Sequence, residues 1–518
     1  MHETRDFVAR DDVPRVSRFG HLEPRPARSV HASALVQDLE LDVLIDVMAG
    51  NEPLLRTVVE RALLEAQYGD LETILYRQAM LRDCLEHPAL IVRVFRTAVE
   101  TLEAARKFWW WGVDERHPSR VLSTAVSLMQ LFVTKLRQLR DVAAPYQGKV
   151  ASTALSGLLA ALRGLDDAYL STVDAQLLGL EFRDGMLLGA QLGPWNAGTA
   201  YTLHKRDANE EPWLRRIFAR SASKLSFRLH PRDEAGARIL ARLRDEGVEQ
   251  AAVAVHRSAD RIKSFFEMLM VESAFYVACL NLRDRLAALG FPTCFPSAAL
   301  AGTRQHRYEN LYDACLALTM QRGVVANSHD LDGRGLVIVT GANQGGKSSH
   351  LRAIGLAQLM MQSGMFVVAD SFAADVSCGV YTHFKREEDA SMHRGKLDEE
   401  LERFSAIADV LRPDALLLLN ESFAATNERE GSQIATDIVR ALVDRRVTVF
   451  YVTHLFEFAH GMAIGPDARV RFLRAERRPD GTRTFQLGEG EPRPESHAED
   501  VFDEVFGSDA PPSSSLQA

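Results

Sequence analysis

A glycine-rich segment has the residue types and spacing of a phosphate-binding site. Residues 336–349 read LVIVTGANQGGKSS and contain a complete G-x-x-x-x-G-K-[ST] pattern. Glycines let the backbone curl until several N–H groups point at phosphate oxygens, and the following helix adds its positive N-terminal end. Lys347 can reach the β- and γ-phosphates, and the Ser348 hydroxyl can ligate Mg²⁺. The predicted nucleotide-binding residues are Gly341, Asn343, Gly345, Gly346, Lys347, Ser348 and Ser349.

The residues on either side place this loop between a strand and a helix. Val337 to Val339 form a buried-type apolar run, and apolar residues recur at helical spacing from Leu351 to Leu359. A glycine-rich turn without a ligand is the alternative, but it does not explain why Lys and Ser begin the helix. The pattern therefore predicts binding of ATP with Mg²⁺.

A second apolar strand ends in polar residues that could complete the site. Four leucines, 416–419, predict a buried parallel strand whose carboxyl end carries Asn420 and Glu421. ATPases with such a loop normally have Asp first, to help hold Mg²⁺, and a following Glu can polarise the attacking water. Asn420 brings no charge, so we predict an indirect magnesium contact there and catalysis by Glu421. An ordinary buried strand ending in a polar turn remains the alternative.

A third strand ends in a histidine. Residues 447–454 read VTVFYVTH, so His454 follows a buried-type strand and could sense the γ-phosphate or orient water. A lone histidine is more often structural, but its place at the end of this strand favours a catalytic role.

The composition is that of a globular protein of several domains. The chain has 518 residues, 46% hydrophobic and 25% charged, and no apolar run approaches the roughly 18 residues of a membrane span. Its N-terminus has no apolar segment typical of secretion, and its five cysteines are scattered without a C-x-x-C pair, so we expect a cytoplasmic protein away from membranes. The net charge of −9 neither indicates nor excludes nucleic-acid binding.

The periodicity of apolar residues divides the chain into four parts. We expect a tail at 1–34, a helical domain at 35–300, an α/β domain at 301–490 and a second tail at 491–518. The helical pattern is interrupted near 180–250, where we predict a hairpin turn at Asp184-Gly185 and a strand over 225–229, and it resumes over 234–289. In the α/β part we predict strands near 336–340, 366–369, 415–420 and 447–452, then a hairpin of 470–473 with 482–487.

Taken together, these motifs resemble those of the MutS family of ABC-type ATPases, the mismatch-repair proteins. The family's phosphate loop corresponds to 340–349, its Walker-B block to 420–431 and its T-H-x-x-E-L block to 453–458. Weaker similarity covers 74–83 and 272–276, in the helical region. The resemblance implies a mostly α-helical MutS core and lever domain with a small β-containing insertion, a reduced clamp, followed by an α/β P-loop (ABC-type) ATPase domain.

The resemblance also implies a homodimer formed through the ATPase domains. In the family, a signature segment of one subunit completes the ATP site of the other, and its counterpart here is 394–400. Gly395 or Lys396 replaces the family's trans-acting serine, and a lysine could also meet phosphate. A charged helix start, with acidic residues near the N-terminal dipole, explains the same segment equally well.

DNA is the partner that the resemblance implies. We expect no mismatch-reading domain, because the core-like motif begins by residue 74, and we assign the FFE sequence at 265–267 to packing. Residues 204–246 carry 11 Lys or Arg against 7 Asp or Glu, which could hold phosphates or simply form a solvated surface. Three consecutive tryptophans, 109–111, point around a helix in different directions, so packing is favoured over base stacking.

Two functions fit these features. The first is a DNA-repair-type ATPase that yields ADP and phosphate as an ATP-driven dimeric switch on DNA. The second is an ATP-gated scaffold with very slow turnover that recruits a protein partner, favoured by Asn420 and the acidic net charge. A transporter-type ATPase is disfavoured, because no LSGGQ-like segment precedes Leu416.

Overall fold

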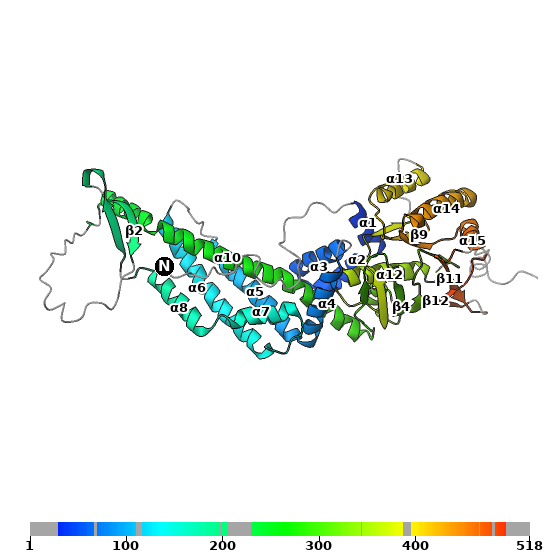
Figure 1. Ribbon diagram of the computed structural model, residues 1–518, viewed down its shortest axis with the longest axis horizontal. Coiled ribbons are helices and arrows are strands. Elements are labelled where there is room, and N and C mark those ends of the chain that lie inside the picture. Colours follow the sequence, from blue (N-terminus) through cyan, green and yellow to red (C-terminus); the bar gives the residue numbers. More distant parts are fainter. Residues whose placement is uncertain are drawn as a thin grey trace, which may run out of the picture. The chain divides into compact units, whose positions relative to one another are not determined.

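The structure is a computed structural model that describes residues 30–66, 70–109, 117–183, 185–196, 198–204, 229–230, 232–342, 344–386, 395–465, 467–478 and 482–493. These residues fall into two compact units (Figure 1). One unit takes the described residues of Ala89–Ser273, and the other takes those of Ser17–Pro88 and Ala274–Ala518.

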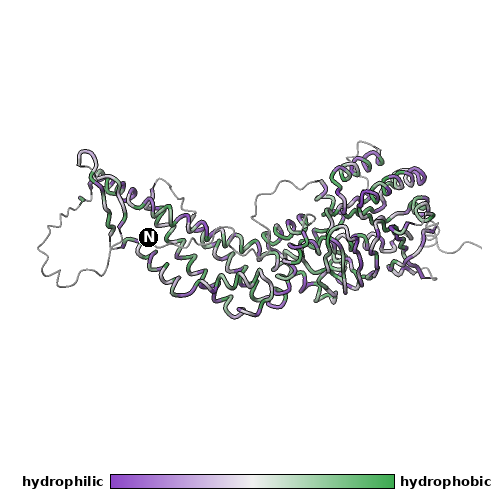
Figure 2. Tube along the Cα trace, in the orientation of Figure 1, coloured by the Kyte–Doolittle hydropathy of each residue, from purple (hydrophilic) through white to green (hydrophobic). Residues whose placement is uncertain are grey.

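The first unit is built mainly from long helices. They are α5 (Pro88–Trp109), α6 (Pro118–Ala143), α7 (Thr153–Arg163), α8 (Asp167–Gly179) and most of α10 (Glu234–Ala288). Apolar and polar residues alternate along them (Figure 2), so each can bury one face, and Phe132 of α6 stacks on Phe266 of α10 at 6.0 Å. Ser152 and Asp166 cap α7 and α8 by accepting from the amides three residues on. The helices expected over 121–139, 155–165 and 234–289 are confirmed.

A two-stranded hairpin also belongs to this unit. Strand β1 (Leu187–Leu192) pairs antiparallel with β2 (Gly198–His204), and the turn between them contains the short 3₁₀ helix Pro194–Asn196. The predicted hairpin turn at Asp184-Gly185 does not join these strands, because both begin after it, although the Gly185 amide donates to the Phe182 carbonyl at 2.9 Å. The D-G pair was a misleading signal for this hairpin, because the left-handed residue in its turn is Trp195 (φ 65°) and not a glycine. Asp184, residues 225–228, Trp110, Trp111 and the Trp109 side chain lie outside the described residues.

The second unit combines four N-terminal helices with two sheets. The helices are α1 (Val30–Asp38), α2 (Leu41–Ala49), α3 (Pro53–Glu65) and α4 (Leu71–Glu86). The contacts of this chain thus place residues 30–88 with the sheets, whereas the sequence pattern had grouped them with the other helices. Polar side chains at the end of α12 take part in the association: Gln362 donates to the Ala66 carbonyl at 2.9 Å, and Ser363 donates to that of Ala62 at 3.3 Å. The domain boundaries at 300 and 490 stay predictions.

The larger sheet has six strands in the order β12-β11-β6-β10-β9-β8. They are β6 (Leu336–Thr340), β8 (Val380–Phe384), β9 (Leu416–Asn420), β10 (Thr448–Val452), β11 (Val470–Arg477) and β12 (Arg483–Glu489). All pair in parallel except β12, which forms the predicted antiparallel hairpin with β11.

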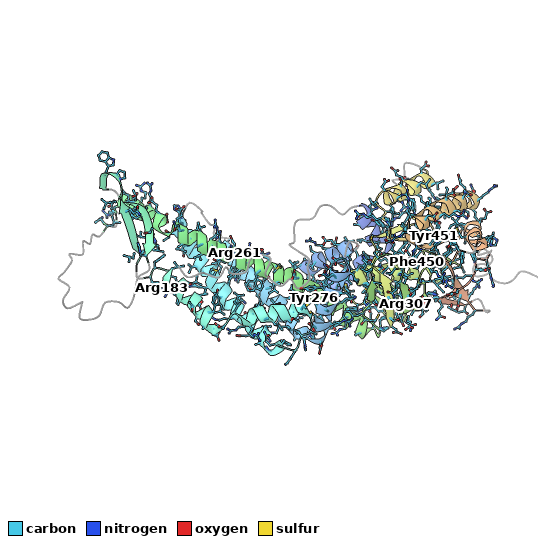
Figure 3. All side chains as sticks on the ribbon, in the orientation of Figure 1. Arg183, Arg261, Tyr276, Arg307, Phe450 and Tyr451 are labelled. Carbon is cyan, nitrogen blue, oxygen red and sulfur yellow. The ribbon has the colours of Figure 1, made fainter. Side chains whose placement is uncertain are left out.

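Helices cover both faces of this sheet, which is why its parallel strands are nearly continuous apolar runs. Leu417 and Leu419 face a core shared with α13 (Lys396–Ala408), α14 (Glu428–Asp444) and α15 (Phe456–Ile464), which lie on one side in Figure 1. Leu418 points the other way, toward α12 (Lys347–Gln362). Phe450 and Tyr451 of β10, labelled in Figure 3, are likewise buried.

A smaller four-stranded sheet has the order β3-β7-β4-β5. Its strands are β3 (Ser297–Ala299), β4 (His306–Leu311), β5 (Asn327–Asp330) and β7 (Ser371–Asp375), with helix α11 (Ala314–Met320) after β4. The strand predicted at 366–369 is wrong. Those residues form a buried connection with one isolated bridge, Cys294 to Val367. The prediction failed because periodicity alone cannot distinguish a short buried apolar run from a buried strand.

One helix of the described residues, α10, is long and apolar enough to cross a membrane by length and composition alone. Other parts of the chain bury 72% of that apolar window, which is also how the core helix of a soluble protein behaves.

Two helical glycines make a matched test of this packing. A Cβ at Gly355 of α12 would lie 2.7 Å from Leu418 Cδ1 and 2.8 Å from Leu39 Cδ2, whereas one at Gly461 of α15 would meet nothing within 4 Å. We expect Gly355→Ala to lower the free energy of unfolding by about 1–3 kcal/mol through overpacking. Gly461→Ala should raise it by about 0.5–1 kcal/mol. Urea unfolding measures both, and equal effects would contradict this packing.

Candidate nucleotide-binding site

The phosphate loop connects β6 to α12 through backbone angles that favour glycine. Gly341 has φ 113° and Gly346 has φ 86°, and Gly346 is the N-cap of α12. A Cβ at Gly345 would lie 2.7 Å from the Ala475 Cβ of β11, so glycine is also needed there for space. Asn343 lies outside the described residues. The loop thus wraps tightly, with the N-terminal end of a 16-residue helix directly behind it.

Lys347, the first residue of α12, is held over this loop. Its side chain is buried, and Nζ donates to the carbonyl oxygens of Gly341 and Ala342, at 2.8 Å each. The Lys347 ammonium therefore lies within the loop, at the place where the loop amides would bind phosphate oxygens. Ser349, half-buried, follows in the first turn of the helix.

Ser348 and Asn420 come together from elements 72 residues apart in the chain. The exposed Ser348 hydroxyl donates to Asn420 Oδ1 at 3.1 Å, and Asn420 is the last residue of β9. A hydroxyl and an amide oxygen are the kind of hard oxygen donors that Mg²⁺ accepts, directly or through water. The residues present therefore fit a magnesium ion, although no carboxylate stands in this pair.

Glu421 and His454 meet at the same edge of the sheet. His454 Nε2 lies 3.4 Å from Glu421 Oε1, and Lys385 Nζ lies 3.9 Å from Oε2. The His454 contact is the main cause that lowers the pKa of Glu421, helped by the charges of Lys385 and Lys347, against the opposing effect of burial. Glu421 is thus ionised at neutral pH, as a group that polarises water requires.

A cavity of about 70 Å³ opens beside these groups. It lies between the ends of β6 and β10 and is covered by the chain that follows β12. Its lining residues are Thr340, Gly341, Thr453, His454, Leu455, Phe456, Pro492 and Arg493.

The structure brings together the predicted residues that it describes, and it adds three neighbours that sequence reasoning missed. Lys385 follows β8, a strand that was not predicted, and a polar residue after a parallel strand was the available signal. Arg493 lines the cavity, and Arg483 of β12 donates to the Gln344 side chain of the loop. No local sequence pattern predicts a role for either arginine. Gly395 and Lys396 begin α13, both exposed.

Comparisons with known proteins agree with this geometry. The family model of the MutS2 N-terminal domain matches residues 69–289, and that of MutS domain V matches 337–486. The chain belongs to the MutS family. It therefore combines helices and sheets in a fold that contains MutS domain V, the P-loop ATPase domain.

Proteins of the MutS family match parts of this chain. DNA mismatch repair protein MutS of Thermus aquaticus is 34% identical over 24% of this chain and 15% of its own length. Endonuclease MutS2 of Thermus thermophilus is 31% identical over 32% of this chain and 23% of its own. DNA mismatch repair protein MSH3 of Coccidioides immitis is 26% identical over 57% and 27%. The chain thus spans under a third of the length of these relatives.

The Ser348–Asn420 pair generates a prediction about magnesium. Asn420→Asp places a carboxylate 3.1 Å from the Ser348 hydroxyl, so the Mg²⁺ concentration for half-maximal ATP binding should fall about tenfold, about 1.4 kcal/mol of added attraction. A magnesium titration with a fluorescent ATP analogue measures it. Asn427→Asp, at the N-cap of α14, is the matched control and should leave the midpoint unchanged. An unchanged midpoint in Asn420→Asp would remove Asn420 from the magnesium site.

Proposed function

We propose that this chain is a Mg²⁺-dependent ATPase that yields ADP and phosphate and acts on DNA as a dimeric switch. The observation that carries the proposal is the convergence of Lys347, the Ser348–Asn420 pair and the Glu421–His454 pair at one edge of the six-stranded sheet. The names of its MutS relatives support the link to DNA repair.

Each group has a distinct part in the proposed hydrolysis. Lys347 exchanges its two loop carbonyls for phosphate oxygens when ATP enters the loop. Ser348 and Asn420 would hold the magnesium ion, which supplies charge neutralisation at the β- and γ-phosphates. Glu421, ionised, accepts a hydrogen bond from the attacking water, and His454 orients the Glu421 carboxylate from the next strand.

The proposed homodimer would add a trans contribution to each site. Gly395 and Lys396 lie exposed at the N-terminus of α13, where an approaching phosphate would meet the first amides of the helix and an ammonium. A lysine at this place can meet a phosphate directly, in place of the serine of the family signature.

The proposal is tested by steady-state ATP hydrolysis with and without plain, mismatched and branched DNA. We expect hydrolysis that DNA stimulates and that falls at least about 100-fold in Glu421→Gln, because the group that polarises water is lost. Lys347→Ala should abolish ATP binding itself, as measured with a fluorescent ATP analogue. Asp437→Asn, on the exposed face of α14, is the control and should behave as the unaltered protein.

The second candidate, an ATP-gated scaffold that recruits a protein partner, is favoured by the neutral Asn420. It expects tight ATP binding that Lys347→Ala abolishes, negligible turnover and no response to DNA. That combination of results would replace the ATPase proposal.

A further inference from the structure

The turn that carries Glu421 is strained. Glu421 has φ 54° and Phe423 has φ 64°, the left-handed region that costs a non-glycine residue about 1–2 kcal/mol. Neighbouring strand β10 holds part of the turn, because the Glu421 amide donates to the Val452 carbonyl at 2.8 Å and the Tyr451 hydroxyl (Figure 3) donates to that of Ser422 at 2.5 Å. Such a conformation persists only where its surroundings impose it.

Helix α13 supplies a second hold through a buried carboxylate. Glu400 is 5% exposed, and its Oε1 accepts the Phe423 amide at 2.7 Å. Burial raises the pKa of Glu400, and the bond from the Phe423 amide opposes that rise. The Phe423 ring packs edge-on against Phe404 of the same helix, with centroids 5.3 Å apart. Both the backbone and the ring of Phe423 are therefore in contact with α13.

Strand β8 supplies a third hold through a buried histidine. His383 Nδ1 lies 2.7 Å from Ser422 Oγ, and Nε2 lies 3.3 Å from the Glu400 carbonyl. Burial lowers the pKa of His383 to about 4, so the ring is neutral at pH 7. The Ser422 hydroxyl donates its one proton to the His383 carbonyl oxygen at 2.7 Å, so a neutral ring that bonds Ser422 Oγ carries its proton on Nδ1.

We propose that Glu400, His383 and Ser422 are positioning residues that fix the Glu421 carboxylate and tie it to α13. The inference rests on the proposed hydrolysis at Glu421. Burying polar groups costs free energy that apolar packing would not, yet buried His383 and Glu400 are bonded to Ser422 and Phe423, the two residues that follow Glu421. Because α13 begins at Lys396, a ligand or second subunit that moves this end of the helix also moves the turn of Glu421.

Paired substitutions separate positioning from packing. Glu400→Ala and Ser422→Ala each remove one hold, so the single-turnover rate of ATP hydrolysis should fall about 10- to 100-fold while the Kd for ATP stays within about twofold. Glu400→Gln and Ser422→Thr keep the acceptor and the hydroxyl, so they should recover most of the rate. Glu402→Ala, on the exposed face of α13, is the matched control and should change neither quantity.

Hydrogen exchange of the amides of 421–425 provides a readout that does not need turnover. Exchange should accelerate about tenfold or more in Glu400→Ala and Ser422→Ala and stay unchanged in Glu402→Ala. If both alanine variants keep the unaltered rate and exchange, the positioning role is overturned, even if their Tm falls. If the unaltered protein does not hydrolyse ATP, the ATPase proposal fails, and the exchange alone then decides whether this network holds the turn.

Discussion

The in-register parallel pairing of β6, β10 and β9 is the constraint on which the candidate site depends. Val452 pairs with Val339 on one side and with Asn420 on the other, so the carboxyl ends of three strands reach the same edge of the sheet. Each strand is followed there by a different part of the site: β6 by the phosphate loop, β9 by Asn420-Glu421 and β10 by His454. A slip of one residue in any pair would turn the apolar strand faces over, and the buried cores on both sides resist such a slip.

The apolar layers beneath this edge also set its electrostatics. Lys347 is buried and half-buried Glu421 lies close to His454 and Lys385, so their charges act through less water than they would on an open surface. This is why the pKa of Glu421 is lowered despite partial burial, whereas burial dominates at Glu400 and raises the pKa of that carboxyl. Two glutamates 21 residues apart thus have opposite shifts, and their partners provide the physical reason.

Polar contacts connect this edge to the elements around it. Gln362 and Ser363, at the end of the phosphate-loop helix, bond to backbone carbonyls at the end of α3, and Arg352 of the same helix pairs with Asp313 at 2.6 Å. On the opposite face of the sheet, Glu400 links α13 to the turn of Glu421. Both helices beside the site are therefore held by directional bonds as well as by packing, which restricts how each can move relative to the strands.

Short-range patterns determined much of this protein from the sequence by itself: the phosphate loop, the apolar strands of Leu336 and Leu416, the long helices and the likeness to MutS proteins. These features depend on residues close in the chain, whose spacing sets backbone angles and periodicity. Strand β8, the absence of a strand at 366–369 and the place of the hairpin turn at Trp195 were decided only in the tertiary structure. So were the neighbours Lys385 and Glu400, because their partners are distant in sequence and only strand pairing and helix docking bring them within bonding distance.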